Sequence, residues 1–177
     1  MALIDTDPNR ALDAVGPVIG AFPSKFHDAW NTMMARKLGL ITSEEADADL
    51  ISDLLELMQA ERLDYTLSFD ALTESVGHAD APTPPALATW MERWRRRIAA
   101  QDPTETQALM RQHNPVVIPR NHHMEAVIQA AVESDDFRPA EAFLDVLKRP
   151  YIRTAATAQY ADAPEDGDKN YQTFCGT

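Results

Sequence analysis

Imidazole and carboxylate side chains gather in one short window of the chain, at His113, His122, His123 and Glu125. Such groups bind transition metals when they converge on one point. His122 and Glu125 are three residues apart and could share a helix face, whereas His123 would point elsewhere. The pattern therefore favours polar residues that cap and solvate the start of a helix, with a metal site as the weaker alternative.

The one cysteine of the chain, Cys175, lies two residues before Thr177. A lone cysteine excludes a disulfide within the chain and a site built from several cysteines. The acidic residues that precede it disfavour the thiolate, the form that acts as nucleophile or metal ligand. A disulfide to a cysteine outside this chain is still compatible with its setting.

Arginines alternate with tryptophans over residues 90–97, WMERWRRR. This composition is typical of nucleic-acid contacts. However, Trp90 and Trp94 are spaced to lie on one apolar helix face, which leaves most of the arginines on the outer face. A formal net charge of −12 also repels phosphate backbones. We therefore expect Trp90 and Trp94 to be structural, Arg95 to contact a carboxylate-bearing partner, and no nucleic acid to bind.

Two prolines, Pro115 and Pro119, interrupt the helical pattern after Asn114. The residues between them are apolar, which predicts an extended buried strap. Asn121 could cap the following helix, leaving Arg120 to reach a buried carboxylate or a backbone carbonyl. Anion binding at the helix start is the alternative. Because the strap needs hydrogen-bond partners, we favour a structural or interface role for Asn114, Arg120 and Asn121.

Sequence motifs that hold phosphates or supply a catalytic base are missing from this chain. It contains no GxGxxG, no GxxxxGK[ST], no HRD and no DFG. We therefore assign it no catalytic residue, no cofactor-binding residue and no metal ligand, and we expect no cofactor to be bound by this chain alone.

Helices must position all of these residues, because apolar residues recur at helical spacing throughout. Pro17 and Pro23 should break or kink the first helical stretch, residues 9–37, and Thr42–Glu45 resembles a capping box. The prediction is an all-α fold of about seven or eight helices in an irregular bundle. Further helices are expected from the Thr42–Glu45 box through Met58, over Leu67–Leu72, from Pro84 or Pro85 to about Ala100, from Pro103 to about His113, over Met124–Ala131, and from Pro139 onward with Phe143, Leu144 and Leu147 on its inner side.

Composition is that of one globular domain, with 45% apolar and 25% charged residues in 177. We expect a helical region over residues 1–150 and a flexible acidic tail over residues 151–177 that ends in the cysteine. No apolar run approaches the roughly 18 residues that span a bilayer, and no secretion signal begins the chain. A cytoplasmic location without membrane contact is the consistent interpretation.

Several segments, taken in their order and spacing, resemble the C-terminal region of the selenoprotein O family. The similarity covers most of the chain. The segments are Arg36–Leu40, Leu54–Met58, Asp64–Thr66 with Phe69, Trp90 with Trp94 and Arg95, Asn114–Asn121, and Leu144–Tyr151.

The resemblance implies a kinase-like protein adenylyltransferase, a pseudokinase that transfers AMP from ATP to Ser, Thr or Tyr hydroxyls of other proteins. Magnesium or manganese would bridge the phosphates in the full-length enzyme. The catalytic and ATP-binding residues of the family precede the matched region, so none is carried over to this sequence. The implied role of this chain is to brace the kinase-like core of the same protein, which is its expected partner.

One functional position of the family does match this sequence. Cys175 corresponds to the near-terminal cysteine or selenocysteine of the family, which implies a redox role. A basic residue is expected in relatives where this chain has Asp70, which puts an ion pair at that position in doubt. The start at Met1 would fall after the kinase core, as in a truncated gene, a split reading frame or an expressed domain. The alternative is a free-standing helical protein-interaction module.

Overall fold

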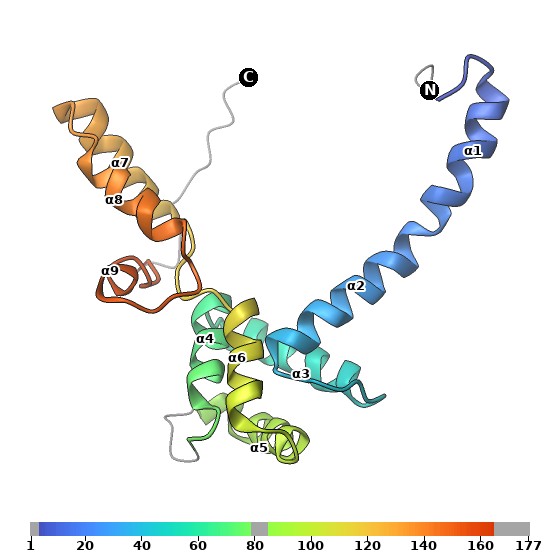
Figure 1. Ribbon diagram of the computed structural model, residues 1–177, viewed down its shortest axis with the longest axis horizontal. Helices are drawn as coiled ribbons and strands as arrows, with labels where there is room; N and C mark the ends of the chain where they lie inside the picture. Colours follow the sequence, from blue (N-terminus) through green and yellow to red (C-terminus); the bar gives the residue numbers. More distant parts are fainter. Residues whose placement is uncertain (1–3, 79–84, 165–177) are drawn as a thin grey trace.

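The computed structural model describes residues 4–78 and 85–164, and within them every regular element is a helix. The all-α prediction is confirmed for this part of the chain. The helices are α1 (Pro8–Gly20), α2 (Phe22–Lys37), α3 (Asp47–Ala60), α4 (Tyr65–Ser75), the short 3-10 helix η1 (Pro85–Leu87), α5 (Ala88–Ile98), α6 (Pro103–His113), α7 (Asn121–Ser134), α8 (Arg138–Leu147) and α9 (Ala155–Ala158) (Figure 1).

A central bundle of α3 to α6, closed by the end of α2, holds the main hydrophobic core. Trp90 and Trp94 stack at its centre, with ring centroids 6.1 Å apart. Their indole N–H groups donate to the backbone oxygens of Leu50 and Leu38, at 2.8 and 2.9 Å. The predicted apolar stripe of α5 is therefore confirmed, and its polar atoms are satisfied within the chain.

The end of α2 is locked onto α6 through a glycine. Gly39 has a φ of +71°, and the N–H groups of Gly39 and Leu40 donate to the oxygens of Arg36 and Ala35 in a Schellman motif. A Cβ at Gly39 would lie 2.6 Å from Cγ2 of Thr106. A glycine is therefore required both by the backbone conformation and by the close approach of α6.

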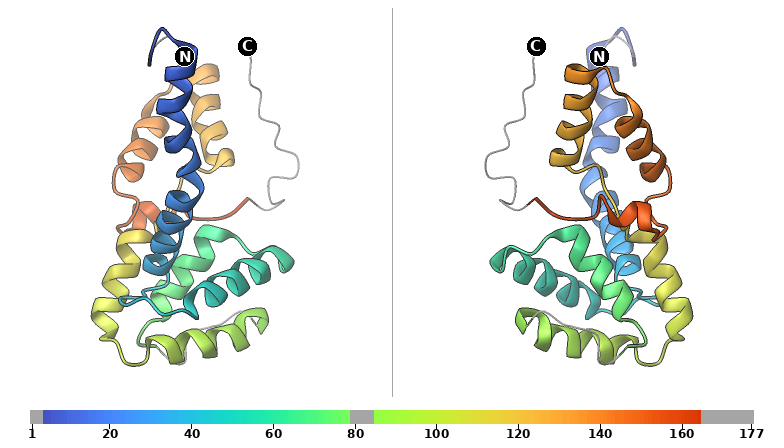
Figure 2. Two further views of the ribbon diagram at one scale, coloured as in Figure 1. Left: turned by 90° about the vertical axis from the view of Figure 1, so that its right-hand side faces the viewer. Right: turned by 90° about the vertical axis from the view of Figure 1, so that its left-hand side faces the viewer.

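Two arms leave the central bundle on the same side, diverging as they extend (Figure 1). The first arm is α1 with most of α2, which meet at Ala21. The predicted break in residues 9–37 is therefore confirmed, although Pro17 lies inside α1 and Pro23 lies in the first turn of α2. The second arm is the antiparallel pair α7 and α8, which Figure 1 shows well apart from the first arm, although the two overlap in the side views of Figure 2.

The second arm joins the bundle through the predicted strap. Val116 and Val117 are buried against Val146 of α8, and the N–H of Val116 donates to the oxygen of Pro150 at 2.8 Å. An extended apolar strap at this place is confirmed, because residues 114–120 contain no helix.

The first part of the segment expected as a flexible tail folds against α8. It contains α9, whose start is capped by Thr154, and Thr157 is only 4% exposed. Thr154 and Thr157 form reciprocal hydrogen bonds that stabilise this short helix. The helix has no apolar periodicity, so it could not be predicted from the spacing of apolar residues. The rest of the predicted tail, with Cys175, lies outside the described residues.

Two local predictions were wrong. The expected capping box at Thr42–Glu45 does not form, since α3 begins at Asp47 and has no side-chain cap. Instead, Asp47 accepts from the N–H of Glu44 at 2.8 Å and from Arg97 of α5 at 2.7 Å. Leu144, expected on the inner side of α8, is 55% exposed.

Candidate functional site

A buried polar hub centred on Asn114 joins α2, α4 and α6. The Asn114 amide donates to the oxygen of Lys37 at 2.8 Å and to Oγ1 of Thr73 at 2.9 Å. Its Oδ1 accepts from Nζ of Lys37 at 3.0 Å. Asn114 is fully buried, so the hub is a buried structural junction between the three helices.

Lys37 was not singled out from the sequence, although it is only 7% exposed. Its Nζ donates to the oxygen of His113 at 3.0 Å and lies 4.8 and 5.3 Å from the ring centroids of Phe69 and Tyr65. Burial lowers the pKa of Lys37 and raises that of Tyr65. Carbonyl oxygens and aromatic faces hold this cation, an arrangement that side-chain spacing in the sequence does not reveal.

Arg120 forms a bidentate ion pair with Asp64, with nitrogen–oxygen distances of 2.8 and 3.0 Å. The predicted contact to a carboxylate is therefore confirmed. The hydrogen bond from Arg120 holds the pKa of Asp64 below its ordinary value. Asp64 also caps α4 by accepting from the N–H of Leu67 at 2.8 Å. This clamp fastens the end of the strap to the start of α4.

Asn121 does not cap α7, contrary to the expectation. The residue at the N-cap is Arg120, and no side chain caps this helix end. Arg120 has the extended backbone that an N-cap needs, with φ −75° and ψ 143°, while its side chain is committed to Asp64. Asn121 is therefore the first helical residue, where its amide cannot take the capping position.

Asp70 accepts hydrogen bonds from two arginines despite the doubt over an ion pair there. Arg111 of α6 lies 2.7 Å from its Oδ1, and Arg153 contacts its Oδ2. The pKa of Arg153 is raised by its hydrogen bond to Asp70. Since Arg153 follows α8, this pair holds the segment before α9 against α4.

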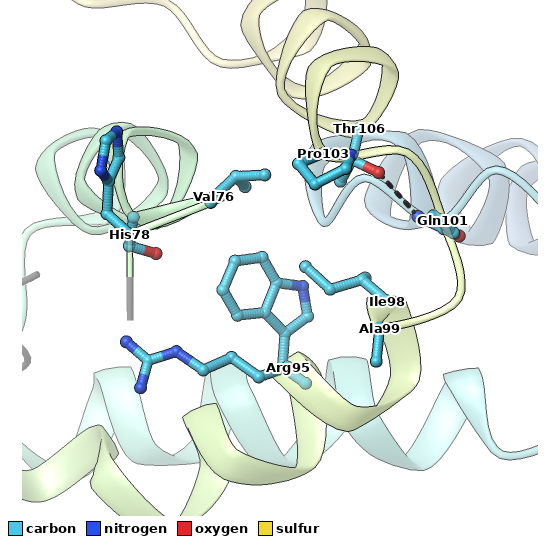
Figure 3. A pocket seen from close by; sticks show the side chains of 11 residues that line it. Val76, His78, Arg95, Ile98, Ala99, Gln101, Pro103 and Thr106 are labelled. Atoms are coloured by element: carbon cyan, nitrogen blue, oxygen red, sulfur yellow. Dashed lines mark hydrogen bonds between the residues drawn. The ribbon is translucent and has the colours of Figure 1, made fainter. Parts of the chain in front are cut away.

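A cavity of about 300 Å³ lies between the end of α4, α5 and the start of α6 (Figure 3). Gln101 and Thr106, joined by a 3.0 Å hydrogen bond, lie on one side, and His78 and Arg95 on the other. Nη2 of Arg95 is buried with no hydrogen-bond partner among the described residues. None of the described lining residues is a carboxylate or a cysteine, so the cavity fits an apolar group with one acceptor better than a metal ion.

A cluster of two imidazoles and a carboxylate lies beside the start of α7. His122 and His123 approach Asp162 with Nε2–carboxylate distances of 3.6 and 3.0 Å. Their ring centroids are 4.0 Å apart, so the expectation that His123 points away from His122 was wrong. Burial alone would raise the pKa of Asp162, but the hydrogen bond to His123 and the two nearby imidazoles together lower it.

The other members of the histidine window do not join this cluster. Nδ1 of His113 lies 2.9 Å from the oxygen of Leu109, within α6, and Glu125 is not among the three converging groups. Asp162 could not be predicted as a partner because it is 39 residues from His123, in a segment expected to be a flexible tail.

Each arm carries a stripe of exposed apolar residues. On the first arm, the exposed residues at helical spacing are Leu12, Ile19, Phe22, Phe26 and Met33, and we call them the α1–α2 stripe. The rings of Phe22 and Phe26 stack with centroids 5.9 Å apart. Both rings are more than half exposed, which is unusual for large apolar side chains with no partner.

The second arm shows the same property. Met124, Ile128 and Val132 recur every four residues along α7, and we call them the α7 stripe. Val132 is 79% exposed, and α7 contains no fully buried residue. The packing of α7 against α8 leaves this face open. Within the described residues, no helix is both long enough and apolar enough to cross a membrane.

Comparison with known proteins identifies the family. The family model described as "Protein adenylyltransferase SelO" matches residues 4–148. The chain belongs to the SelO family. Its similarity to that family covers the central bundle and both arms.

Relatives carry the name "Protein nucleotidyltransferase YdiU". Those of Rhizobium meliloti and Teredinibacter turnerae are each 42% identical, and that of Geobacillus kaustophilus is 39% identical. Each match includes 100% of this chain but only 37–38% of the relative. The chain thus spans little more than a third of the length of these SelO-family proteins.

Proposed function

We propose that this chain is the C-terminal helical region of a SelO-type protein adenylyltransferase, and that it braces the kinase-like core of that enzyme. The whole enzyme transfers AMP from ATP to Ser, Thr or Tyr hydroxyls of protein substrates. Membership of the SelO family and the nucleotidyltransferase name of its relatives support the activity. The lack of phosphate-binding motifs in this sequence supports the idea that another part of the enzyme binds ATP.

The observation that carries this proposal is the pair of exposed apolar stripes on the two arms. Exposed apolar surface of this extent marks a site of protein contact. The larger part of each relative lies outside the match. That missing part is the partner that the stripes fit, because it would be present in the same molecule at all times.

In this arrangement ATP and its magnesium or manganese ion are held by the kinase-like core and not by this chain. The chain's own residues keep the two arms in place: the Asn114 hub and the Arg120–Asp64 clamp fix where the second arm leaves the bundle. Cys175 is proposed to be a redox-sensitive thiol of the full enzyme. Its partner would be a cysteine outside this chain.

Reconstitution in two pieces tests the proposal. The part of the Rhizobium meliloti relative outside the match is purified and mixed with this chain, and transfer of labelled AMP to protein is measured. We expect neither piece alone to reach the activity of the mixture, and this chain alone to bind no ATP. AMP transfer by the purified chain alone would overturn the proposal.

A matched pair of variants connects this activity to the first arm. Phe26→Asp places a charge on the α1–α2 stripe, whereas His27→Asp places the same charge on the next, exposed position. Phe26→Asp should weaken the complex at least about tenfold, since it buries a charge in an apolar contact. His27→Asp should leave it unchanged. If no complex forms with any SelO-family core, the free-standing interaction module becomes the better explanation.

A further inference from the structure

The His–His–Asp cluster, formed by His122, His123 and Asp162, has no part in the proposed function. Its three candidate ligand atoms all lie within 4.8 Å of one another. In a tetrahedral zinc site with ligands at about 2.0–2.1 Å, neighbouring ligand atoms are about 3.3 Å apart. His123 Nε2 lies 3.0 Å from Oδ1 of Asp162, and His122 Nε2 lies 3.6 Å from Oδ2, so each imidazole is close to that spacing from one of the two carboxylate oxygens. Small side-chain rotations would therefore complete the geometry.

His122 supplies the second observation. Both of its ring nitrogens are buried, and neither has a hydrogen-bond partner among the described residues. The 3.6 Å distance from Nε2 to Asp162 is too long for a hydrogen bond. Leaving a buried ring nitrogen unpaired is unfavourable, and a neutral imidazole offers a lone pair that a metal ion can accept.

An aromatic wall holds the cluster together. The His123 ring packs against Tyr160 and Phe143, with centroid distances of 5.2 and 6.0 Å, and those two rings lie 4.6 Å apart. Phe143 is buried in α8. Because Tyr160 is two residues before Asp162, this wall keeps the carboxylate next to α7. Ligands supported in this way need little reorganisation on binding.

We propose that the His–His–Asp cluster binds a zinc ion through one nitrogen of each imidazole and one oxygen of Asp162. Water would complete the tetrahedron, as in sites with three protein ligands. Paired imidazoles select zinc over magnesium, which prefers oxygen ligands and retains water. The ion would tie the segment that follows α9 to the start of α7, independently of any nucleotide.

Metal titration of the 177-residue chain, after treatment with a chelator, tests the proposal. We expect one equivalent of zinc by calorimetry, and a tetrahedral visible absorption spectrum with cobalt as the substitute ion. His122→Ala and Asp162→Asn should each weaken zinc binding at least about tenfold. His27→Ala removes an exposed histidine of α2 and is the control that should change nothing.

Hydrogen exchange of amides 155–162 gives a second readout. Zinc should slow exchange there in the wild type but not in Asp162→Asn. The Asp162 side chain is 65% exposed, so this variant keeps the fold even if a histidine variant does not. Absence of zinc binding to the folded chain, or zinc binding unchanged in Asp162→Asn, would overturn the proposal. Binding lost in His27→Ala would show an adventitious ion only, with the same consequence.

Discussion

The central bundle and the two arms differ in how completely their side chains are satisfied within the chain. In the bundle, both tryptophan indoles, the Asn114 amide and the Arg97 guanidinium all find partners inside it. Along the arms, α7 buries no residue fully and α1 buries only Ala11. A region that closes on itself can fold alone, whereas open apolar faces indicate a region that depends on a partner.

Trp94→Ala should have the largest effect, because it attacks the bundle at its centre. The side chain is fully buried and its indole donates to the oxygen of Leu38. Truncation leaves a cavity and one unpaired acceptor, and we expect a loss of about 3–5 kcal/mol in the free energy of unfolding. Urea denaturation followed by circular dichroism measures it. A loss below about 1 kcal/mol would show that the bundle is not the stable part of the chain.

Asn114→Ala should come next. It leaves Nζ of Lys37, the oxygen of Lys37 and Oγ1 of Thr73 without their Asn114 contacts in a buried place. Each unpaired group costs about 1–3 kcal/mol in the free energy of unfolding. Because the surrounding side chains relax, we expect the total loss to lie near the lower end of the range for the three groups together. Asn121→Ala is the matched control. Since Asn121 caps no helix, its loss should stay within about 0.5 kcal/mol in the same denaturation experiment.

The Arg120–Asp64 clamp predicts a dependence of stability on pH. The pKa of Asp64 is lower in the folded state than its ordinary value of 3.8. The ion pair therefore stabilises the fold fully above that ordinary value, and this contribution is lost as the pH falls through the lower folded value. Denaturation between pH 6 and pH 2 should show a smaller acid loss in Asp64→Asn than in the wild type.

Asp136 provides the control for that experiment. Arg138 lowers the pKa of Asp136 to about 2, but the Arg138 side chain is 87% exposed and Asp136 is only partly buried. Solvent screening makes such pairs contribute little. Asp136→Asn should therefore leave the acid profile close to that of the wild type. If Asp136→Asn flattened the profile more than Asp64→Asn, the clamp would not be the acid-sensitive contact.

Much of the fold could be predicted because its signals are local. Apolar spacing indicated the stripe of Trp90 and Trp94, and Pro115 and Pro119 marked the strap. The start of α3 could not be predicted in this way. Asp47 is held by Arg97, 50 residues away, and such a tertiary contact overrides the local capping signal at Thr42–Glu45.

The candidate site was less accessible to the same reasoning. The ring orientations of His122 and His123 depend on packing against Tyr160, and the partner carboxylate belongs to a segment without apolar periodicity. The contact of Arg120 with a carboxylate or carbonyl was predictable from the sequence, because the backbone groups of the strap need hydrogen-bond partners. Its partner Asp64 was not, because 56 residues separate the two.

Val132→Gln should have the smallest effect on stability and gives the sharpest contrast with Trp94. The Val132 side chain is 79% exposed, and glutamine is a good helix former, so the free energy of unfolding should change by less than about 0.5 kcal/mol. The same change should weaken the complex with the kinase-like core, because it interrupts the α7 stripe. A loss comparable to that of Trp94→Ala would mean that α7 packs within this chain, and the difference between bundle and arms would disappear.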